Sequence, residues 1–284
     1  MRLANLNERL VLVGESATLD VETASGGRFS SRPQDIYEVW EEFLAWASTQ
    51  DVEAGWETRP GIDAQQFGAP VPHPRQIFAV GLNYVEHAKE SGLDLPAAPL
   101  VFTKFPSSIT GPSGDIELSG ERVDWEVELV VVIGEQARYI DEGDAWSHVA
   151  GFTIGQDISD RSVQQAGSSP QFSLGKSFDK YAPTGPWLVT LDEFKNRDDL
   201  RVESDLNGVK MQDSRTSDLV FSVSYLVSYL SRIVTLWPGD LIFTGTPSGV
   251  GMGRTPPRFL AGGDLLTTRI EGIGSMSHRF TSSR

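Results

Sequence analysis

The sequence VDWEVELVVVI at residues 123–133 decides the fold class of this chain. Side chains two positions apart in a strand point to the same face, about 6.6–6.8 Å apart along the chain. Glu126 and Glu128 therefore share a face with Val130 and Val132, while the other face is apolar throughout. Because both faces of its second half are apolar, we expect this strand to be covered on both sides.

Two carboxylates on one face of a covered strand repel each other, and burial deprives them of hydration. Both effects are unfavourable unless a positive charge between the carboxylates compensates for them. A hard divalent cation such as Mg²⁺, Mn²⁺ or Ca²⁺ suits such oxygen ligands. The alternative is a strand end that emerges into solvent, where glutamate pairs are common. A further apolar run ends at Asp157, which is either a third ligand or the cap of the turn that follows.

Short β-like runs continue through the rest of the chain, and helical periodicity is scarce. Helices are expected from Pro33 to Ala47 and over residues 222–233, where apolar positions recur at three- and four-residue steps. Strands that follow one another without alternating helices favour a mixed α+β fold, mainly β, of the roll or sandwich type. The expected strands are 77–80, 100–103, 125–133, 149–154, 187–190, 241–243 and 265–270.

The first part of the chain has a different pattern and predicts a small domain of its own. Residues 10–21 alternate like a β-hairpin, and the expected helix from Pro33 follows. The segment from Thr58 to Pro74 is rich in proline and glycine, which indicates a linker. We therefore expect a small N-terminal α+β domain over residues 1–72 and the main domain over residues 73–284.

The composition of the chain limits the classes of molecule that it is expected to bind. The chain has 284 residues, a formal net charge of -15, no cysteine and a mean hydropathy of -0.22. Such a negative surface disfavours nucleic acid and anionic membranes as partners. The absence of cysteine excludes a disulfide framework, a thiolate nucleophile and a zinc–thiolate site. No apolar run reaches the length of a membrane span, and no signal peptide is evident, so we expect a cytoplasmic protein.

One short segment after the strand at 77–80 combines a histidine with carboxylates. Asn83 followed by Glu86 predicts a capping box and hence a short helix. On that helix His87 and Glu90 share a face. A carboxylate beside an imidazole fixes its tautomer and raises its basicity, as a general base requires. The alternative is a solvated surface pair.

Two loops offer further polar groups. Lys176 lies in a loop where it either anchors a substrate carboxylate or is solvated. The glycine-rich sequence at residues 239–251 lacks both the Gly-Lys-Ser/Thr of a phosphate loop and the order of a dinucleotide fingerprint, so nucleotide binding is rejected. Its amides and the Thr246 hydroxyl either hold an anion or form a plain turn.

In their order along the chain, these segments resemble the fumarylacetoacetate hydrolase family. The resemblance covers roughly residues 73–280, nearly all of the expected main domain, and the segment before it resembles the small N-terminal domain of some bacterial members. The segments that carry it are GLNYVEHAKE, TKFPSSITGP, VDWEVELVVVIG, GFTIGQDISDRSVQ, GKSFDKYAPTGPW, LNGVKMQDSRTSDLVFSVSYLVSYLS and WPGDLIFTGTPSGVG.

The resemblance implies a β-sandwich roll that forms homodimers and binds Mg²⁺ or Mn²⁺. The chain departs from the family's usual Arg-Asp-x-Gln at Ser162, a position that is not expected to be a ligand. The implied metal ligands are Glu126, Glu128 and Asp157; the implied base dyad is His87 with Glu90; the implied groups for the keto-acid end of a substrate are Arg161, Gln164, Lys176 and Thr246.

These expectations indicate a metal-dependent hydrolase. It would cleave a C–C bond in a β-diketo acid of the acylpyruvate or fumarylpyruvate type, giving pyruvate and a carboxylic acid. The same site also suits decarboxylation of oxaloacetate and isomerisation of a 2-hydroxyhepta-2,4-diene-1,7-dioate type of substrate, because each reaction stabilises an enolate. A metal-binding β domain without catalysis is the remaining alternative.

Overall fold

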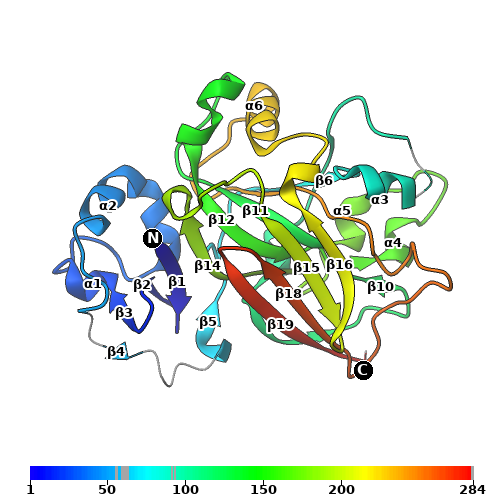
Figure 1. Cartoon of the computed structure of the whole chain (residues 1–284), viewed down its shortest axis with the longest axis horizontal. Coiled ribbons are helices and arrows are strands. Elements are labelled where there is room, and N and C mark those ends of the chain that lie inside the picture. Colours follow the sequence, from blue (N-terminus) through cyan, green and yellow to red (C-terminus); the bar gives the residue numbers. More distant parts are fainter. Residues whose placement is uncertain (55–56, 59–63, 91, 93, 283–284) are drawn as a thin grey trace.

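The computed structural model describes residues 1–282 except 55–56, 59–63, 91 and 93. Residues 59–63 of the predicted linker therefore lie outside the described residues. The fold is mixed α and β and consists mainly of strands, as predicted (Figure 1). Within the described residues, no helix has both the length and the apolar character needed to cross a bilayer.

A large, mostly antiparallel sheet runs through the molecule. Two short strands join it at the side, where β5 (Phe67–Gly68) pairs with β1 and β8 (Ile109–Thr110) pairs with β14. In pairing order, its other strands are β4 (Glu57–Thr58), β3 (Ala17–Asp20), β2 (Arg9–Val13), β1 (Arg2–Leu6), β14 (Ala182–Thr190), β12 (Val149–Gln156), β11 (Val127–Ile133), β17 (Leu241–Phe243), β6 (Ile77–Gly81) and β7 (Leu100–Thr103).

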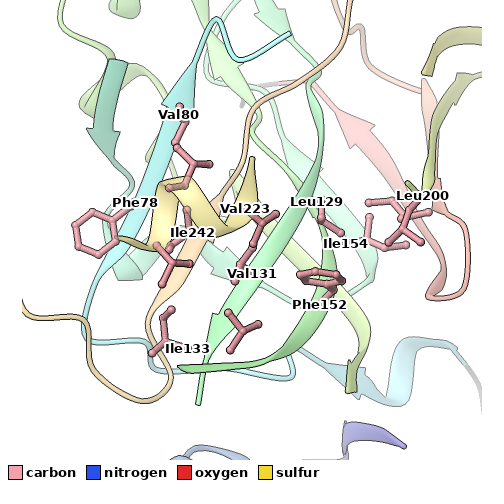
Figure 2. Packing of buried hydrophobic residues seen from close by; sticks show 14 of the residues in the cluster. Phe78, Val80, Leu129, Val131, Ile133, Phe152, Ile154, Leu200, Val223 and Ile242 are labelled. Atoms are coloured by element: carbon pink, nitrogen blue, oxygen red, sulfur yellow. The ribbon is translucent and has the colours of Figure 1, made fainter. Parts of the chain in front are cut away.

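A second sheet packs against the first and closes the predicted sandwich. Leu129 and Phe152 of the first sheet share a hydrophobic core with Val202 and Ile270 of the second, and Figure 2 shows Leu129 and Phe152 among the packed side chains. A two-stranded ribbon, β10 (Val123–Asp124) with β13 (Ser159–Asp160), lies beside these sheets. The second sheet has the order β16 (Val209–Arg215), β15 (Arg201–Leu206), β18 (Leu265–Ile270), β19 (Gly274–Thr281) and β9 (Ser113–Glu117).

Short helices and 3-10 turns connect the strands. The predicted helix at 222–233 is confirmed as α6 (Val223–Ile233), whose N-terminus is capped by the Ser222 hydroxyl accepting from Tyr225 N at 3.2 Å. The others are α1 (Val21–Ala24), η1 (Pro33–Val39), α2 (Trp40–Ala47), η2 (Ala64–Gln66), α3 (Val85–Glu90), η3 (Pro106–Ser108), η4 (Glu142–His148), α4 (Arg161–Gln164), α5 (Phe172–Gly175), η5 (Leu191–Glu193) and η6 (Thr216–Asp218).

Two expected elements differ from those observed. The single helix expected from Pro33 to Ala47 is divided at Val39, whose φ of -130° and ψ of 33° break the helical path between η1 and α2. The strand expected over 125–133 starts only at Val127, because Trp125 and Glu126 lie between β10 and β11. The other predicted runs all contain strands.

The N-terminal strands extend the large sheet. The predicted hairpin is confirmed by antiparallel pairing of β2 with β3, and β1 pairs with β14. Leu12 and Phe43 share a hydrophobic core with Val130 and Phe243 of the main segment. Residues on both sides of position 72 thus contribute to one sheet and one core, and the domain boundary itself stays a prediction.

His278 on β19 makes stability depend on pH. Its Nε2 lies 3.0 Å from the Gly111 carbonyl oxygen, and burial lowers the pKa of His278 from 6.5 to about 4. The unfolded chain therefore binds a proton that the folded chain does not between these values, so stability falls as pH drops from 6.5 toward 4. We expect this group alone to make the free energy of unfolding, measured in urea, about 2 kcal/mol lower at about pH 5 than at about pH 7.5. His278→Gln should remove that part of the pH dependence, and an unchanged dependence would contradict the assignment.

Candidate active site

Three buried carboxylates meet where β11 and β12 pair. Glu126 precedes β11, Glu128 lies within it, and Asp157 directly follows β12. The register places Val127 opposite Gln156, and the Asp157 N–H donates to the Glu126 carbonyl at 2.9 Å. One carboxylate oxygen from each acid lies within 4.8 Å of the others. The predicted triad is therefore brought together, and it lies in the interior of the protein, not at a solvated strand end.

Glu126 and Asp157 form ion pairs with buried cations, whereas Glu128 has none among the described residues and accepts from the Gly245 amide. Burial raises the pKa of Glu128, and the neighbouring Asp157 and Glu126 carboxylates raise it further. Burial also acts to raise the pKa of Glu126, but Lys176, Arg161 and His87 together lower it below its usual range. Hard oxygen donors, buried and crowded in this way, fit Mg²⁺ or Mn²⁺. Asp157 is not a helix cap, because Asp160 caps α4.

Two buried lysines contact the triad. Lys176 Nζ donates to Glu126 Oε2 at 2.7 Å, to Asp157 Oδ2 at 2.6 Å and to the Ser159 hydroxyl at 2.8 Å. Lys104 Nζ donates to Asp157 Oδ1 at 2.5 Å and to the Lys176 carbonyl oxygen. Burial lowers the pKa of Lys104 against the opposing effect of Asp157, whereas Asp157 and Glu126 raise the pKa of Lys176 despite burial.

Sequence reasoning singled out Lys176 but missed Lys104. Lys104 follows the edge strand β7, and a lysine at the end of an edge strand is ordinarily solvated. Its side chain is instead completely buried. The TKFPSSITGP segment marked this part of the chain as informative, but only the fold shows that its lysine reaches Asp157.

The predicted dyad is formed on α3, beside the triad. His87 Nδ1 lies 3.2 Å from Glu90 Oε2, and Glu90 Oε1 accepts from Gly249 N at 2.9 Å. The His87 side chain is 9% exposed and that of Glu90 16%, so this is not a solvated surface pair. The contact through Nδ1 leaves Nε2 as the nitrogen that can take up a proton.

The predicted capping box at the start of α3 is wrong. Asn83 Oδ1 accepts from Phe221 N at 2.8 Å, and its Nδ2 donates to the carbonyls of Thr244 at 2.7 Å and Phe221 at 3.0 Å. The amide side chain thus ties the base of α3 to two distant segments and is not free to cap the helix. Leu82, with φ of 57°, makes the turn from β6 toward α3.

Arg161 and Gln164 lie on α4, and both are buried. Arg161 donates to Asp124 Oδ2 at 2.9 and 2.8 Å, to Glu126 Oε1 at 2.7 Å and to Gln164 Oε1 at 2.8 Å. In this arrangement Arg161 supports the metal-ligand candidate Glu126 directly. Its role toward a substrate stays a prediction. Ser162, where the chain departs from the family pattern, is exposed and donates its N–H to Asp160.

The loop after β17 forms hydrogen bonds with Glu128 of the triad and with the backbone of β11. Gly245 N donates to Glu128 Oε2 at 2.7 Å, and a Cβ at Gly245 would lie 2.8 Å from that of Asn83. The Thr246 hydroxyl donates to the Val127 carbonyl and accepts from Gln212 Nε2, at 2.9 and 2.7 Å. Because the loop amide and hydroxyl already have protein partners, contact of Thr246 with a substrate stays a prediction.

A cavity of about 360 Å³ opens onto this cluster. His87, Glu126, Glu128, Lys176 and Thr246 contribute to its wall. Gln164 also lines it, whereas Asp157 and Arg161 support the lining residues through hydrogen bonds. The arrangement therefore places a candidate base and a candidate metal centre on one small cavity.

Asp124 is a further buried acid that sequence reasoning missed. Its Oδ1 accepts from Trp125 N and Gly251 N at 2.9 and 2.6 Å, and its Oδ2 accepts from Met252 N at 3.0 Å and from Arg161. We expect Asp124→Asn to lower the free energy of unfolding by about 3 kcal/mol, because it leaves a buried guanidinium short of a partner. Urea denaturation without added metal measures this. Asp115→Asn, on an exposed residue, is the control; equal stability of both variants would contradict the prediction.

The part of the chain that contains the site is similar in sequence to known proteins. Residues 76–281 match the family model for the fumarylacetoacetate (FAA) hydrolase C-terminal domain. The human protein named oxaloacetate tautomerase FAHD2A, mitochondrial, is 44% identical over 271 residues, covering 90% of this chain and 85% of its own. The 2,4-didehydro-3-deoxy-L-rhamnonate hydrolase of Sphingomonas sp. (strain SKA58) is 41% identical over 253 residues, covering 88% and 87%.

Solved structures of related proteins resemble this chain over its whole length. A protein from Mycobacterium smegmatis of known crystal structure is 52% identical, with a TM-score of 0.94 over the whole of both chains. The maleylpyruvate hydrolase of Sphingobium sp. SYK-6, solved in complex with manganese(II) ion and pyruvate, is 26% identical, with a TM-score of 0.78 over the whole of both chains. Both the sequence match and the fold show that the chain belongs to the fumarylacetoacetate hydrolase family.

Proposed function

We propose that this protein is a divalent-metal-dependent hydrolase that cleaves a C–C bond in a β-diketo acid of the acylpyruvate or fumarylpyruvate type. The products are pyruvate and a carboxylic acid. The observation that carries the proposal is the His87–Glu90 dyad on the wall of the cavity that Glu126 and Glu128 also line. Hydrolysis needs a base to activate water, and the dyad is the group that can supply one.

The relatives support this reaction class. One of them is named as a hydrolase of a didehydro-deoxy sugar acid, and a structural neighbour is a maleylpyruvate hydrolase that holds manganese and pyruvate. Glu126, Glu128 and Asp157 would hold Mg²⁺ or Mn²⁺ in this chain, with Ca²⁺ as a further candidate. When bound, such a cation supplies Lewis-acid stabilisation of the negative charge that develops on an enolate oxygen.

The side chains of this chain account for the remaining steps. Glu90 holds His87 through Nδ1, so Nε2 takes a proton from water as the water oxygen attacks the distal carbonyl carbon. The bond between that carbon and the central CH₂ then breaks, and its electron pair leaves on the pyruvate enolate. His87 returns the proton to the enolate carbon, which gives pyruvate. Lys176, at the cavity wall, adds positive charge beside the developing anion.

Tautomerisation of oxaloacetate is the second candidate. The observation that favours it is the 44% identity with a human protein of that name over 90% of this chain. Such a reaction moves a proton between carbon and oxygen, so it needs the same base and enolate stabilisation but no attacking water. Decarboxylation of oxaloacetate would need neither the base nor water.

One experiment separates these reactions. Metal-stripped enzyme is assayed with and without added Mg²⁺ or Mn²⁺ on acetylpyruvate, fumarylpyruvate and oxaloacetate, with pyruvate release and keto–enol conversion followed in parallel. Metal-dependent release of pyruvate from an acylpyruvate supports the hydrolase. Keto–enol conversion of oxaloacetate without hydrolysis of either acylpyruvate would replace it by the tautomerase, and pyruvate from oxaloacetate alone would replace it by a decarboxylase.

A further inference from the structure

The cavity beside the triad has a polar part and an apolar part that adjoin. Lys176 Nζ lies 5.1 Å from the centre of the Phe102 ring, and Phe102 packs edge-to-face on Phe172 at 5.4 Å. Leu100 lies two positions before Phe102 on β7, so both side chains point to the same face of the strand, and both line the cavity. Met252 lines it as well. A ligand that reaches past the triad therefore meets aromatic and aliphatic side chains, and the uncharged amides of Gln164 and Gln165 also belong to the wall.

The positive charges near this surface already have partners. Lys176 is the only lysine or arginine among the described residues that line the cavity, and its ammonium group is bound by Glu126 and Asp157. Lys104 donates to Asp157 and does not line the cavity. Arg161 is held by Asp124 and Glu126.

Two arginines outside the cavity wall lie close to residues that line it. Arg254 lies two residues after Met252 and donates to the carbonyls of Met211 at 2.9 Å and Gly249 at 3.4 Å. Arg122 donates to the side chain of Gln165, a lining residue, at 3.4 Å, and its guanidinium lies 5.4 Å from the centre of the Phe259 ring. It reaches the cavity only through Gln165. A carboxylate at the far end of a ligand would thus lose its hydration against apolar side chains with no cation of the cavity wall left to pair with it.

We infer that the cavity selects 2-oxo acids whose far end is uncharged and apolar, and that it discriminates against dicarboxylates. The inference rests on the proposed function for the statement that the 2-oxo acid end binds at the triad. It narrows the proposed substrates to acylpyruvates with an uncharged acyl group. It also predicts that a four-carbon dicarboxylate binds to this cavity less tightly than a 2-oxo acid with an uncharged far end.

A matched pair of ligands tests the inference by binding, without turnover. 2-Oxopentanoate and 2-oxoglutarate have the same five-carbon chain and differ only in a terminal methyl against a terminal carboxylate. Isothermal titration of the full chain in the presence of Mg²⁺ should show 2-oxopentanoate binding at least about 10-fold more tightly. Equal or tighter binding of 2-oxoglutarate, or binding of neither, overturns the inference.

A substitution in the apolar part tests where the selection arises. Leu100 is 40% exposed at an edge strand, so Leu100→Arg can be accommodated while it places a cation beside the far end of the ligand. It should reduce the preference for 2-oxopentanoate at least about 10-fold. Val209→Arg, on a residue that is 61% exposed in the second sheet, adds the same charge elsewhere and should leave the preference unchanged.

The outcomes of these titrations separate the inference from the proposed reaction. An unaltered preference in Leu100→Arg, or an equal loss in Val209→Arg, overturns the assignment of selectivity to the apolar part of the cavity. A chain that prefers 2-oxopentanoate but hydrolyses no acylpyruvate retains the inference and loses the proposed reaction. A chain that hydrolyses acylpyruvates and yet binds 2-oxoglutarate more tightly retains the reaction and loses the inference.

Discussion

Glu126→Gln is expected to weaken binding of Mn²⁺ or Mg²⁺ by at least about 100-fold, since changes to groups that merely support a ligand already cost 10–100-fold. The amide removes one of three anionic ligands. It also leaves the ammonium of Lys176 and the guanidinium of Arg161, both within 2.7 Å of the Glu126 carboxylate, without that counter-charge. Two positive groups would then face the site with one carboxylate fewer between them, which opposes the entry of a cation.

Calorimetric titration of the metal-stripped protein measures this loss directly. Glu135→Gln removes the same charge at an exposed position directly after the β11–Gly134 segment and serves as the control. Urea denaturation of both variants without metal shows whether the loss of affinity is separate from a loss of folding. Unchanged affinity in Glu126→Gln would mean that Glu126 is held by Lys176 and Arg161 for structural reasons and is not a ligand.

The strand at residues 123–133 allowed the two glutamates of the triad to be predicted, because period-two alternation is local information. Asp157 joined the predicted triad only through the family resemblance. The alternation places Glu126 and Glu128 on one side whatever the rest of the chain does, and both are buried as the apolar second half implied. The interruption between β10 and β11 was not predictable from alternation. It arises where Glu126 N donates to the Gln156 side chain and not to a strand partner.

Strand β18 of the second sheet was predicted, but its partners β9, β15, β16 and β19 were missed for a different reason. Their sequences alternate apolar residues with charged ones, as in β15, where Val202 and Leu206 are buried between exposed or half-buried polar positions. A usable signal was present in Asn207–Gly208, which turns β15 into β16 with positive φ at both residues. Asn-Gly between two short runs is a strong hairpin signal, and reading it that way would have predicted the pair.

The contacts that Lys104 and Asn83 make with distant segments were not predicted from the sequence. Lys104 is 53 residues from Asp157, and Asn83 is 138 residues from Phe221. In each case the residue type allows an ordinary local role, a solvated lysine or a helix cap, and only the pairing of distant strands brings the actual partner close. The pairing of β1 with β14 is of the same kind, because nothing in residues 1–72 indicates which strand they extend.

His87→Ala is expected to lower kcat by about 100- to 10,000-fold, the range that a positioned general base contributes. Metal affinity should change little, because the imidazole contacts Glu90 and is not one of the triad ligands. His73→Ala, at an exposed histidine, controls for loss of an imidazole as such. Added imidazole should restore part of the turnover of His87→Ala, since a small base can enter the space that the side chain leaves.

The rescue separates proton transfer from support of the structure. Glu90 also accepts from Gly249 N, so loss of His87 could release Glu90 and loosen the loop that Asp124 holds at Gly251 and Met252. A loosened loop would not be repaired by free imidazole, and it would lower the stability of the variant in urea. Full turnover in His87→Ala would remove the base from the mechanism and leave the triad to act alone. In that case decarboxylation, which needs no attacking water, becomes the reaction that the cavity supports best.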